Sequence, residues 1–296
     1  MKRISLIILS FVILAAMISA GCLYALRQSS FYKPSYLVNE VVTDDFDYII
    51  IGASTGLTTL NTKVIDSVLG VNGVNLSIDD TAIASQYLML QHFLAEGKTT
   101  KYCVLAPNPM GYDIVKDDLS DNDYRFMPYV NRDYVSRYYQ SFSGMEANLS
   151  YTSKWFPMLG VGYYNAELFY PSIVSLISPE KHNRFDAQGN YTYPKVERQD
   201  QKVEKRTDTH LKFKNNYLEK IQELCRKNNI ELICYVSPML QRNILVDNPD
   251  YIVINHSHLI QTNALFYDEL HVNSEGRETT SKQFAQDLKQ LASNSQ

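Results

Sequence analysis

The chain has 296 residues, of which 45% are hydrophobic and 20% are charged, and its formal net charge is −4 at pH 7. Such a length is sufficient for one large α/β domain behind an apolar N-terminal segment. Proteins that bind nucleic acid usually carry a basic patch or stripe, so this charge gives no reason to expect a nucleic-acid partner. None of the four cysteines has the short spacing of a zinc site, and we expect neither a metal nor a cofactor.

Two cysteines, Cys103 and Cys234, lie in apolar strand-like runs. A free cysteine in such a run usually behaves as a small buried hydrophobic residue. In an oxidising compartment Cys225 and Cys234 could instead form a disulfide, and the sequence leaves both possibilities open.

An uncharged run from Ile4 to Leu26 follows Lys2 and Arg3. As a helix this run is roughly 35 Å long, enough to cross a hydrocarbon core of about 30 Å. Basic residues before the run favour an inside N-terminus and export of the rest of the chain. We therefore predict a single N-terminal transmembrane anchor or signal over residues 1–27, in the cell membrane, with the folded body outside the cytoplasm.

The same segment allows two further interpretations. Small residues precede Cys22, as in a lipoprotein signal, although Ser19 stands where leucine is usual. A cleaved signal peptide is the third possibility. An uncleaved anchor agrees best with the apolar residues that continue beyond Cys22.

Residues 28–45 are polar and are predicted to be a tether, and strands then alternate with helices from 46 to 292. Short apolar runs that end at glycine or proline predict strands, and apolar residues at helical spacing predict helices. The predicted strands are 46–52, 73–78, 102–106, 231–236 and 251–254. The predicted helices are 58–69, 81–95, 211–226 and 274–291.

Between the third and fourth strands, residues 113–208 interrupt this alternation. Of the 22 tyrosines, 11 lie between Tyr124 and Tyr193, and the single Trp155 lies there too. We predict an aromatic-rich insertion with short helices, whose aromatic rings either stack on sugars or pack within the protein.

The alternation as a whole predicts an α/β fold, a three-layer sandwich with a mostly parallel central sheet. In such sheets functional groups collect at the carboxyl ends of the strands. Ser54, Asn108 and Ser237 each follow a predicted strand closely, so we expect them at that edge.

The first motif that carries chemistry is Gly-Ala-Ser-Thr-Gly, residues 52–56. A serine hydroxyl is a weak nucleophile and needs a base to take its proton. A sharp strand-to-helix turn exposes such a hydroxyl and directs backbone N–H groups at a developing oxyanion. Ser54 is therefore a candidate nucleophile, although a glycine-rich turn alone is also common in purely structural settings.

The second motif is Asp268-x-x-His271-x-Asn273, just before the last predicted helix. His271 can act as general base, and Asp268 can hold its other ring nitrogen. The short spacing lets one loop carry both side chains. We predict that Ser54, His271 and Asp268 form a catalytic triad. His256 and His258 lie in a polar loop, where solvation is a simpler explanation than a metal site.

Together the two motifs resemble the SGNH/GDSL hydrolase superfamily, which carries its serine just after the first strand and an Asp-x-x-His before the last helix. The resemblance covers about residues 46–110 and 209–292. It implies an SGNH, flavodoxin-like fold with Ser54 as nucleophile, His271 as base and Asp268 as its partner.

Within that superfamily the chain looks most like membrane-anchored proteins related to D-alanine transfer in teichoic acid synthesis and to polysaccharide O-acetylation. The shared features are the anchor, the IIIGAS strand, the segment Asn75 to Ser77 and the turn at 185–189. The resemblance implies an extracytoplasmic serine esterase or acyltransferase that acts on acyl esters of cell-envelope glycans. A membrane-bound O-acyltransferase is the implied protein partner.

The chain departs from the family pattern around the oxyanion hole. Asp79 and Asp80 stand where the family usually has a glycine, and Asn108 is the nearest counterpart of the family asparagine. We expect the backbone of Ser54 and the side chain of Asn108 to serve the oxyanion. Because a nearby acid opposes negative charge there, a non-catalytic scaffold beside a membrane O-acyltransferase is the alternative function.

Two other fold classes match the first motif. Residues 52–56 fit the GxSxG pattern of α/β-hydrolases, but there the serine usually follows a later strand and acid and histidine occupy separate loops. A dinucleotide-binding turn would need a third glycine, and the segment Leu57 to Leu60 continues without one.

Overall fold

The computed structural model describes residues 2–196, 206–247 and 250–294. The chain divides into two compact units: the first consists of Met1–Val42 and Asp121–Asn183, and the second of Thr43–Ser120 and Arg184–Gln296. The second unit contains every residue predicted for the catalytic site.

The second unit is built on a five-stranded parallel sheet with the order β2-β1-β3-β5-β7. Its strands are β1 (Asp45–Gly52), β2 (Gly73–Asn75), β3 (Thr99–Ala106), β5 (Glu231–Val236) and β7 (Ile252–Asn255). All five were predicted, although β2 is shorter than expected. The chain moves outward from β1 to β2 and then returns across β1 to β3, so the strand order reverses beside β1. In doubly wound sheets this reversal opens a crevice at the carboxyl ends of the strands.

A separate two-stranded parallel sheet pairs β4 (Thr207–Leu211) with β6 (Arg242–Val246). The sequence did not predict it, because β4 reads TDTHL and four of its five residues are not buried. Leu211 consequently ends a strand, and the helix predicted from that residue begins at Asn216 instead.

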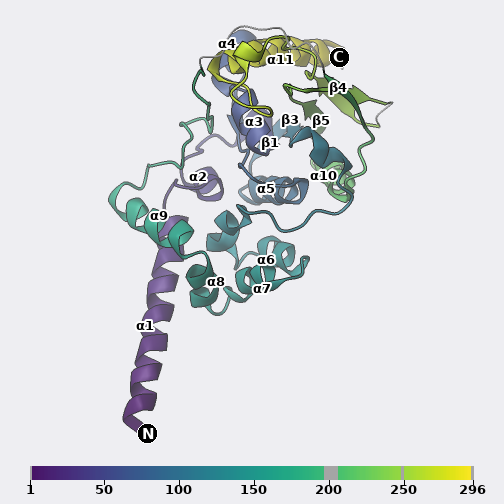
Figure 1. Cartoon of the computed structure of the whole chain (residues 1–296). Helices are drawn as coiled ribbons and strands as arrows, with labels where there is room; N and C mark the ends of the chain where they lie inside the picture. The colour runs from purple at the N-terminus through teal and green to yellow at the C-terminus, as the bar shows by residue number, and fades with distance from the viewer. Residues whose placement is uncertain (1, 197–205, 248–249, 295–296) are drawn as a thin grey trace. The chain divides into compact units, whose positions relative to one another are not determined.

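Helices cover both faces of the five-stranded sheet, with α3, α4 and α11 on one face and α5 and α10 on the other (Figure 1). Their bounds are α3 (Ser54–Thr59), α4 (Thr62–Leu69), α5 (Ile83–Ala95), α10 (Asn216–Lys227) and α11 (Ser274–Asn294), and the 3-10 helices are η1 (Pro109–Asp113) and η3 (Asn263–Leu265). The predicted α/β three-layer sandwich with a parallel central sheet is therefore confirmed. The helix predicted at 58–69 is divided at Asn61, which caps α4 by accepting a hydrogen bond from the Lys63 backbone N–H.

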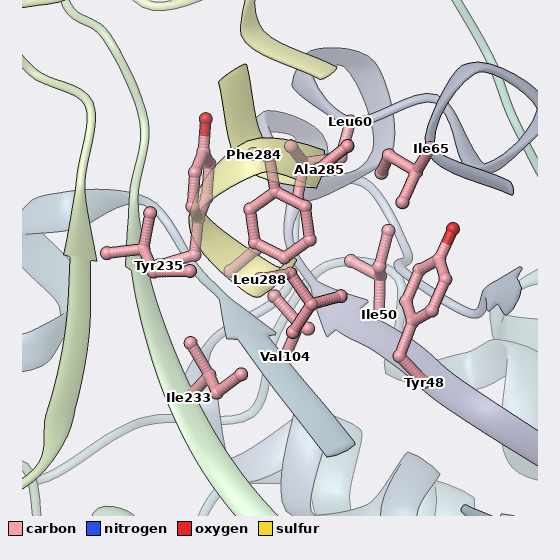
Figure 2. Packing of buried hydrophobic residues seen from close by; sticks show 12 residues of the cluster. Tyr48, Ile50, Leu60, Ile65, Val104, Ile233, Tyr235, Phe284, Ala285 and Leu288 are labelled. Carbon is pink, nitrogen blue, oxygen red and sulfur yellow. The ribbon is translucent and has the colours of Figure 1, made fainter. Parts of the chain in front are cut away.

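The core between the sheet and α11 is formed by side chains that alternate along the strands. Tyr235 of β5 meets the ring of Phe284 edge-on, with the ring centroids 5.6 Å apart. Figure 2 shows how helix and strand side chains meet in this layer: Phe284, Ala285 and Leu288 come from α11, and Ile50, Val104 and Ile233 from the strands. This packing fixes α11 on the sheet, and α11 directly follows the loop that carries His271.

The first unit is helical. It contains α1 (Lys2–Arg27), α2 (Lys33–Asn39), η2 (Asp123–Tyr129), α6 (Asp133–Gln140), α7 (Met145–Thr152), α8 (Pro157–Tyr163) and α9 (Asn165–Ile177). By length and composition α1 can cross a membrane, as predicted. The predicted tether, 28–45, includes α2 and the first residue of β1. The predicted insertion contains the short helices η2 and α6 to α9, and its residues 197–205 lie outside the described residues.

Candidate active site

Ser54 lies at the sharp turn where β1 ends and α3 begins. A Cβ atom at Gly52 would lie 2.2 Å from the carbonyl oxygen of Ala106, and one at Gly56 would lie 2.6 Å from the same atom. No side chain fits at such distances, so both glycines allow the turn to pack against the end of β3. Ser54 itself remains half-buried, with its hydroxyl at the carboxyl end of the sheet.

The C-terminal end of the short helix α3 is held by polar side chains from distant parts of the chain. The carbonyl oxygen of Leu60 accepts from Arg277 at 3.0 Å and from Asn75 at 3.4 Å, and that of Thr59 accepts from Thr280 at 2.7 Å. These bonds satisfy carbonyl groups at the end of the helix that have no partner within it. Asn75, at the end of β2, therefore supports the segment that carries Ser54.

Asp268 and His271 occupy one tight loop between η3 and α11. One carboxylate oxygen of Asp268 accepts from the backbone N–H groups of Leu270 and His271, each at 2.8 Å. The other lies 2.8 Å from His271 Nδ1. Because a carboxylate only accepts, Nδ1 carries the proton, and the second ring nitrogen is left as an acceptor.

His271 Nε2 lies 2.9 Å from Ser54 Oγ, although the two residues are 217 positions apart in the chain. The serine hydroxyl donates to Nε2, so a continuous chain of hydrogen bonds runs from the hydroxyl through the imidazole to the carboxylate. The structure thus brings together Ser54, His271 and Asp268, the three residues predicted to form the triad. Such an arrangement is chemically able to take the serine proton as the oxygen attacks.

The electrostatics of this pair favour an ionised carboxylate. Partial burial of Asp268 opposes its charge, but the hydrogen bond from the His271 ring and the two backbone N–H groups outweigh that effect. They lower the pKa of Asp268 below its ordinary value. An ionised Asp268 stabilises the imidazolium that forms when His271 accepts a proton.

Asn273, the last residue of the Asp-x-x-His-x-Asn motif, anchors the loop. It is fully buried; its side chain accepts from the backbone N–H of Gly276 at 3.1 Å and donates to the carbonyl oxygen of Ala264 at 2.7 Å. Asn273 therefore caps the N-terminus of α11 and also fixes the preceding loop. Gly276 permits this contact, because a Cβ there would lie 2.2 Å from the Leu265 carbonyl oxygen.

A stacked pair of tyrosines lies beside His271, and the sequence did not single the pair out. The rings of Tyr193 and Tyr267 stack with centroids 4.2 Å apart and planes inclined by 7°. The Tyr193 ring also lies 5.1 Å from the His271 ring. Tyr193 is the last member of the tyrosine-rich stretch, and Tyr267 precedes Asp268 directly. Their proximity depends on long-range packing that no spacing pattern reveals.

Asp79 and Asp80 add negative charge to this region. Burial raises the pKa of Tyr193, and the charges of Tyr191, Asp268 and these two aspartates raise it further. Asp80 adopts a left-handed backbone conformation with φ of 52°, which glycine, asparagine and aspartate tolerate best. The turn after β2 thus has a glycine-like backbone but carries a carboxylate.

Asn108 directly precedes η1, shortly after the end of β3. Its side-chain oxygen accepts from the backbone N–H of Met110 at 3.1 Å. Among the hydrogen bonds of the described residues none joins Asn108 to Ser54. The structure places Asn108 beyond the strand next to that of the nucleophile, and its amide NH₂ is the group that remains to donate to a ligand.

His256 does not lie in a solvated loop, as the sequence suggested. It is buried, its Nε2 lies 2.6 Å from Asp287 of α11, and its Nδ1 lies 3.2 Å from the hydroxyl of Tyr235. Across the described ranges 2–196, 206–247 and 250–294, no group of three or more His, Cys, Asp or Glu residues is arranged to hold a metal ion. The four cysteines are buried free thiols.

No family model matches the chain, and a search of curated proteins found no match. The geometry of the site and the resemblance of its motifs are therefore what indicates a function.

Proposed function

We propose that the protein is an extracytoplasmic serine esterase or acyltransferase of the SGNH/GDSL type, which acts on acyl esters of cell-envelope glycans. The observation that carries this proposal is the hydrogen-bonded chain from Ser54 through His271 to Asp268 at the carboxyl end of β1. The order of the three residues along the chain and the Asp-x-x-His loop before the last helix also match that superfamily.

In the proposed reaction, Ser54 Oγ attacks the ester carbonyl carbon while His271 Nε2 takes its proton. The negative charge on the carbonyl oxygen is stabilised by the backbone N–H of Ser54 and by the amide NH₂ of Asn108. His271 then returns the proton to the leaving alcohol as the acyl-enzyme forms. Water or a sugar hydroxyl, deprotonated by the same histidine, attacks the acyl-enzyme and regenerates Ser54.

A glycan substrate is favoured by the aromatic groups beside the base. The stacked rings of Tyr193 and Tyr267 lie next to His271, where an acceptor hydroxyl must be deprotonated. Aromatic faces pack well against the apolar faces of sugar rings. The apolar helix α1 agrees with a single N-terminal pass that keeps the enzyme at the membrane, beside a membrane-bound O-acyltransferase that would supply or receive acyl groups.

A non-catalytic scaffold is the second candidate, and the turn with Asp79 and Asp80 is the observation that favours it. A carboxylate in the turn where the superfamily has its oxyanion glycine opposes the charge that develops on the ester oxygen. In a scaffold, the hydrogen bond between Ser54 and His271 would persist without turnover.

The deciding experiment is labelling of the full-length protein in detergent with a fluorophosphonate, with Ser54→Ala as control. The proposal predicts one covalent adduct, on Ser54, and none on the variant. Hydrolysis of an activated acetyl ester is then measured with and without oligosaccharide acceptors, because acylated sugar indicates transfer and acetate alone indicates a plain esterase. A folded protein that takes no label and turns over no ester would leave the scaffold as the explanation.

The proposed location has a separate test. Protease added to intact cells should digest the body of the protein if it lies outside the cytoplasm. Cys22→Ser distinguishes the two forms of anchoring, since a lipoprotein loses its lipid mass and a transmembrane anchor does not. A body that is cleaved only after the cytoplasm is opened would contradict the proposed topology.

A further inference from the structure

Helix α9 of the first unit has an unusual distribution of apolar side chains. Its buried side packs Leu168 and the partly buried Phe169 and Val174 toward α1, and its outward side also carries large apolar residues, which are exposed. Leu176 and Ile177 are 72% and 78% exposed. A helix on the surface of a soluble protein usually turns polar residues outward, with only its apolar stripe facing the core.

The buried side of α9 packs against the C-terminal part of α1. There Pro171, Ser172 and Ser175 are buried, and small residues let two helices approach closely. The residues of α1 that are buried all lie between Ser19 and Leu26. Figure 1 shows α9 beside this end of α1.

The position of these contacts along α1 indicates how deep they lie in the proposed membrane. About 20 helical residues span a hydrocarbon core of about 30 Å, and counting from Ile4 reaches Leu23. The stretch from Ser19 to Leu26 that contacts α8 and α9 therefore straddles the outer boundary of the core. The large apolar residues from Ile4 to Ile18, on the other side of that boundary, are exposed, as a membrane-spanning segment requires.

A second exposed apolar group precedes α8, which also packs on α1. It consists of Trp155 and Phe156, which are 55% and 58% exposed. Tryptophan and tyrosine are enriched where a membrane meets water, because their rings are apolar and their N–H or O–H groups are polar. Together with four exposed residues of α9, these two form what we call the α8–α9 surface: Trp155, Phe156, Tyr170, Ile173, Leu176 and Ile177.

We infer that the α8–α9 surface lies in the interfacial layer of the same membrane that α1 crosses, so that this part of the first unit is in contact with lipid. The inference rests on the proposed anchoring by α1. Lipid is favoured as the occupant because the surface adjoins the outer end of a helix that itself has exposed apolar residues over most of its length. An amphipathic element of this kind buries its apolar face about 5–10 Å into the boundary between headgroups and acyl chains.

The chain contains a single tryptophan, Trp155, which serves as an internal reporter. The full-length protein is reconstituted into phosphatidylcholine vesicles that contain phosphatidylcholine brominated near the top of its acyl chains. Trp155 emission should shift to the blue, lose intensity to the brominated lipid and resist quenching by iodide in the buffer. The triple variant Ile173→Ser, Leu176→Ser and Ile177→Ser should lose most of the bromolipid quenching, whereas Val68→Ser, at a 50% exposed apolar position of the other unit, should keep it.

A second reporter tests the anchoring separately. In Phe11→Trp with Trp155→Phe, the only tryptophan lies within α1 and should be quenched by bromolipid if α1 spans the bilayer. If that reporter is quenched but Trp155 remains open to iodide, or is shielded from both quenchers as under a protein partner, the lipid contact is wrong. If neither reporter meets lipid, the anchoring fails and the contact fails with it. Fluorophosphonate labelling of Ser54 is independent of both results, so failure of the proposed chemistry is seen separately.

Discussion

Two histidine–aspartate pairs of the second unit share one hydrogen-bonding order, although the two ring nitrogens exchange roles between them. In one, His271 donates to Asp268 at 2.8 Å and accepts from the hydroxyl of Ser54. In the other, His256 donates to Asp287 at 2.6 Å and accepts from the hydroxyl of Tyr235. Each imidazole therefore connects a carboxylate to a hydroxyl group.

The two pairs differ in the hydroxyl that they hold and in its access to solvent. Ser54 is half-buried on a turn between a strand and a helix, whereas Tyr235 is fully buried in the core below α11. Burial raises the pKa of Tyr235 far above its ordinary value, so its phenol stays neutral and acts as a fixed donor. A hydroxyl–imidazole–carboxylate chain is therefore not sufficient for catalysis, because a substrate must also reach the hydroxyl.

Substitution of the two histidines should have very different effects on esterase turnover. His271→Ala should lower esterase turnover by about ten thousandfold or more, and adding Ser54→Ala should lower it little further, because members of a triad act as a unit. His256→Ala should retain turnover within a few-fold wherever the protein is folded. Equal losses in the two histidine variants, measured on an activated ester, would contradict the assignment of His271 as the base.

Stability should show the opposite ranking. His256→Ala removes two buried hydrogen bonds, one of them to a charged partner, and should cost about 2–3 kcal/mol. Solvent screens the His271–Asp268 pair through Asp268, which is 44% exposed, and His271→Ala should therefore cost only about 1 kcal/mol. Thermal unfolding of both variants in the same detergent measures the difference, and a larger shift for His271→Ala would reverse the structural role assigned to His256.

In the proposed reaction, the aromatic pair beside His271 should affect acyl transfer to a sugar more than hydrolysis of the ester. Tyr193→Ala removes the ring stacked on Tyr267 and should reduce transfer to an oligosaccharide by about tenfold, which corresponds to about 1.4 kcal/mol of lost contact. Tyr193→Phe keeps the ring and should retain transfer. Ester hydrolysis in water serves as the control reaction, and an equal loss there would show that the ring only positions His271.

A smaller change is expected in how the melting temperature depends on pH in the acid range. Hydrogen bonds lower the pKa of both Asp268 and Asp287 against the opposing effect of burial. Their contribution to stability is therefore present above the unfolded value of about 3.9 and is lost as the pH falls through the lower folded values. Asp268→Asn and Asp287→Asn should each weaken the dependence of the melting temperature on pH below about pH 4. Only Asp268→Asn should also reduce turnover at neutral pH.

The sequence predicted the central sheet because its strands are buried on both faces and read as continuous apolar runs. It also singled out Ser54, His271 and Asp268, which the structure joins by hydrogen bonds, because two short motifs carry them. It could not reveal β4, whose polar residues lack a hydrophobic pattern, or the buried position of His256, which depends on α11 packing over the loop. Tyr193 was likewise hidden, since its place beside His271 is set by the path of a long connection.

The attachment of α11 to α3 has a consequence for the timing of activity. Ser54 lies early in the chain and His271 late, and the two meet only when α11 has docked through Arg277 and Thr280 onto the end of α3. If the chain is exported as proposed, a chain that is still crossing the membrane holds Ser54 without His271. The proposed activity would then begin only when α11 has reached the outside and folded, and esters on the cytoplasmic side would not be exposed to it.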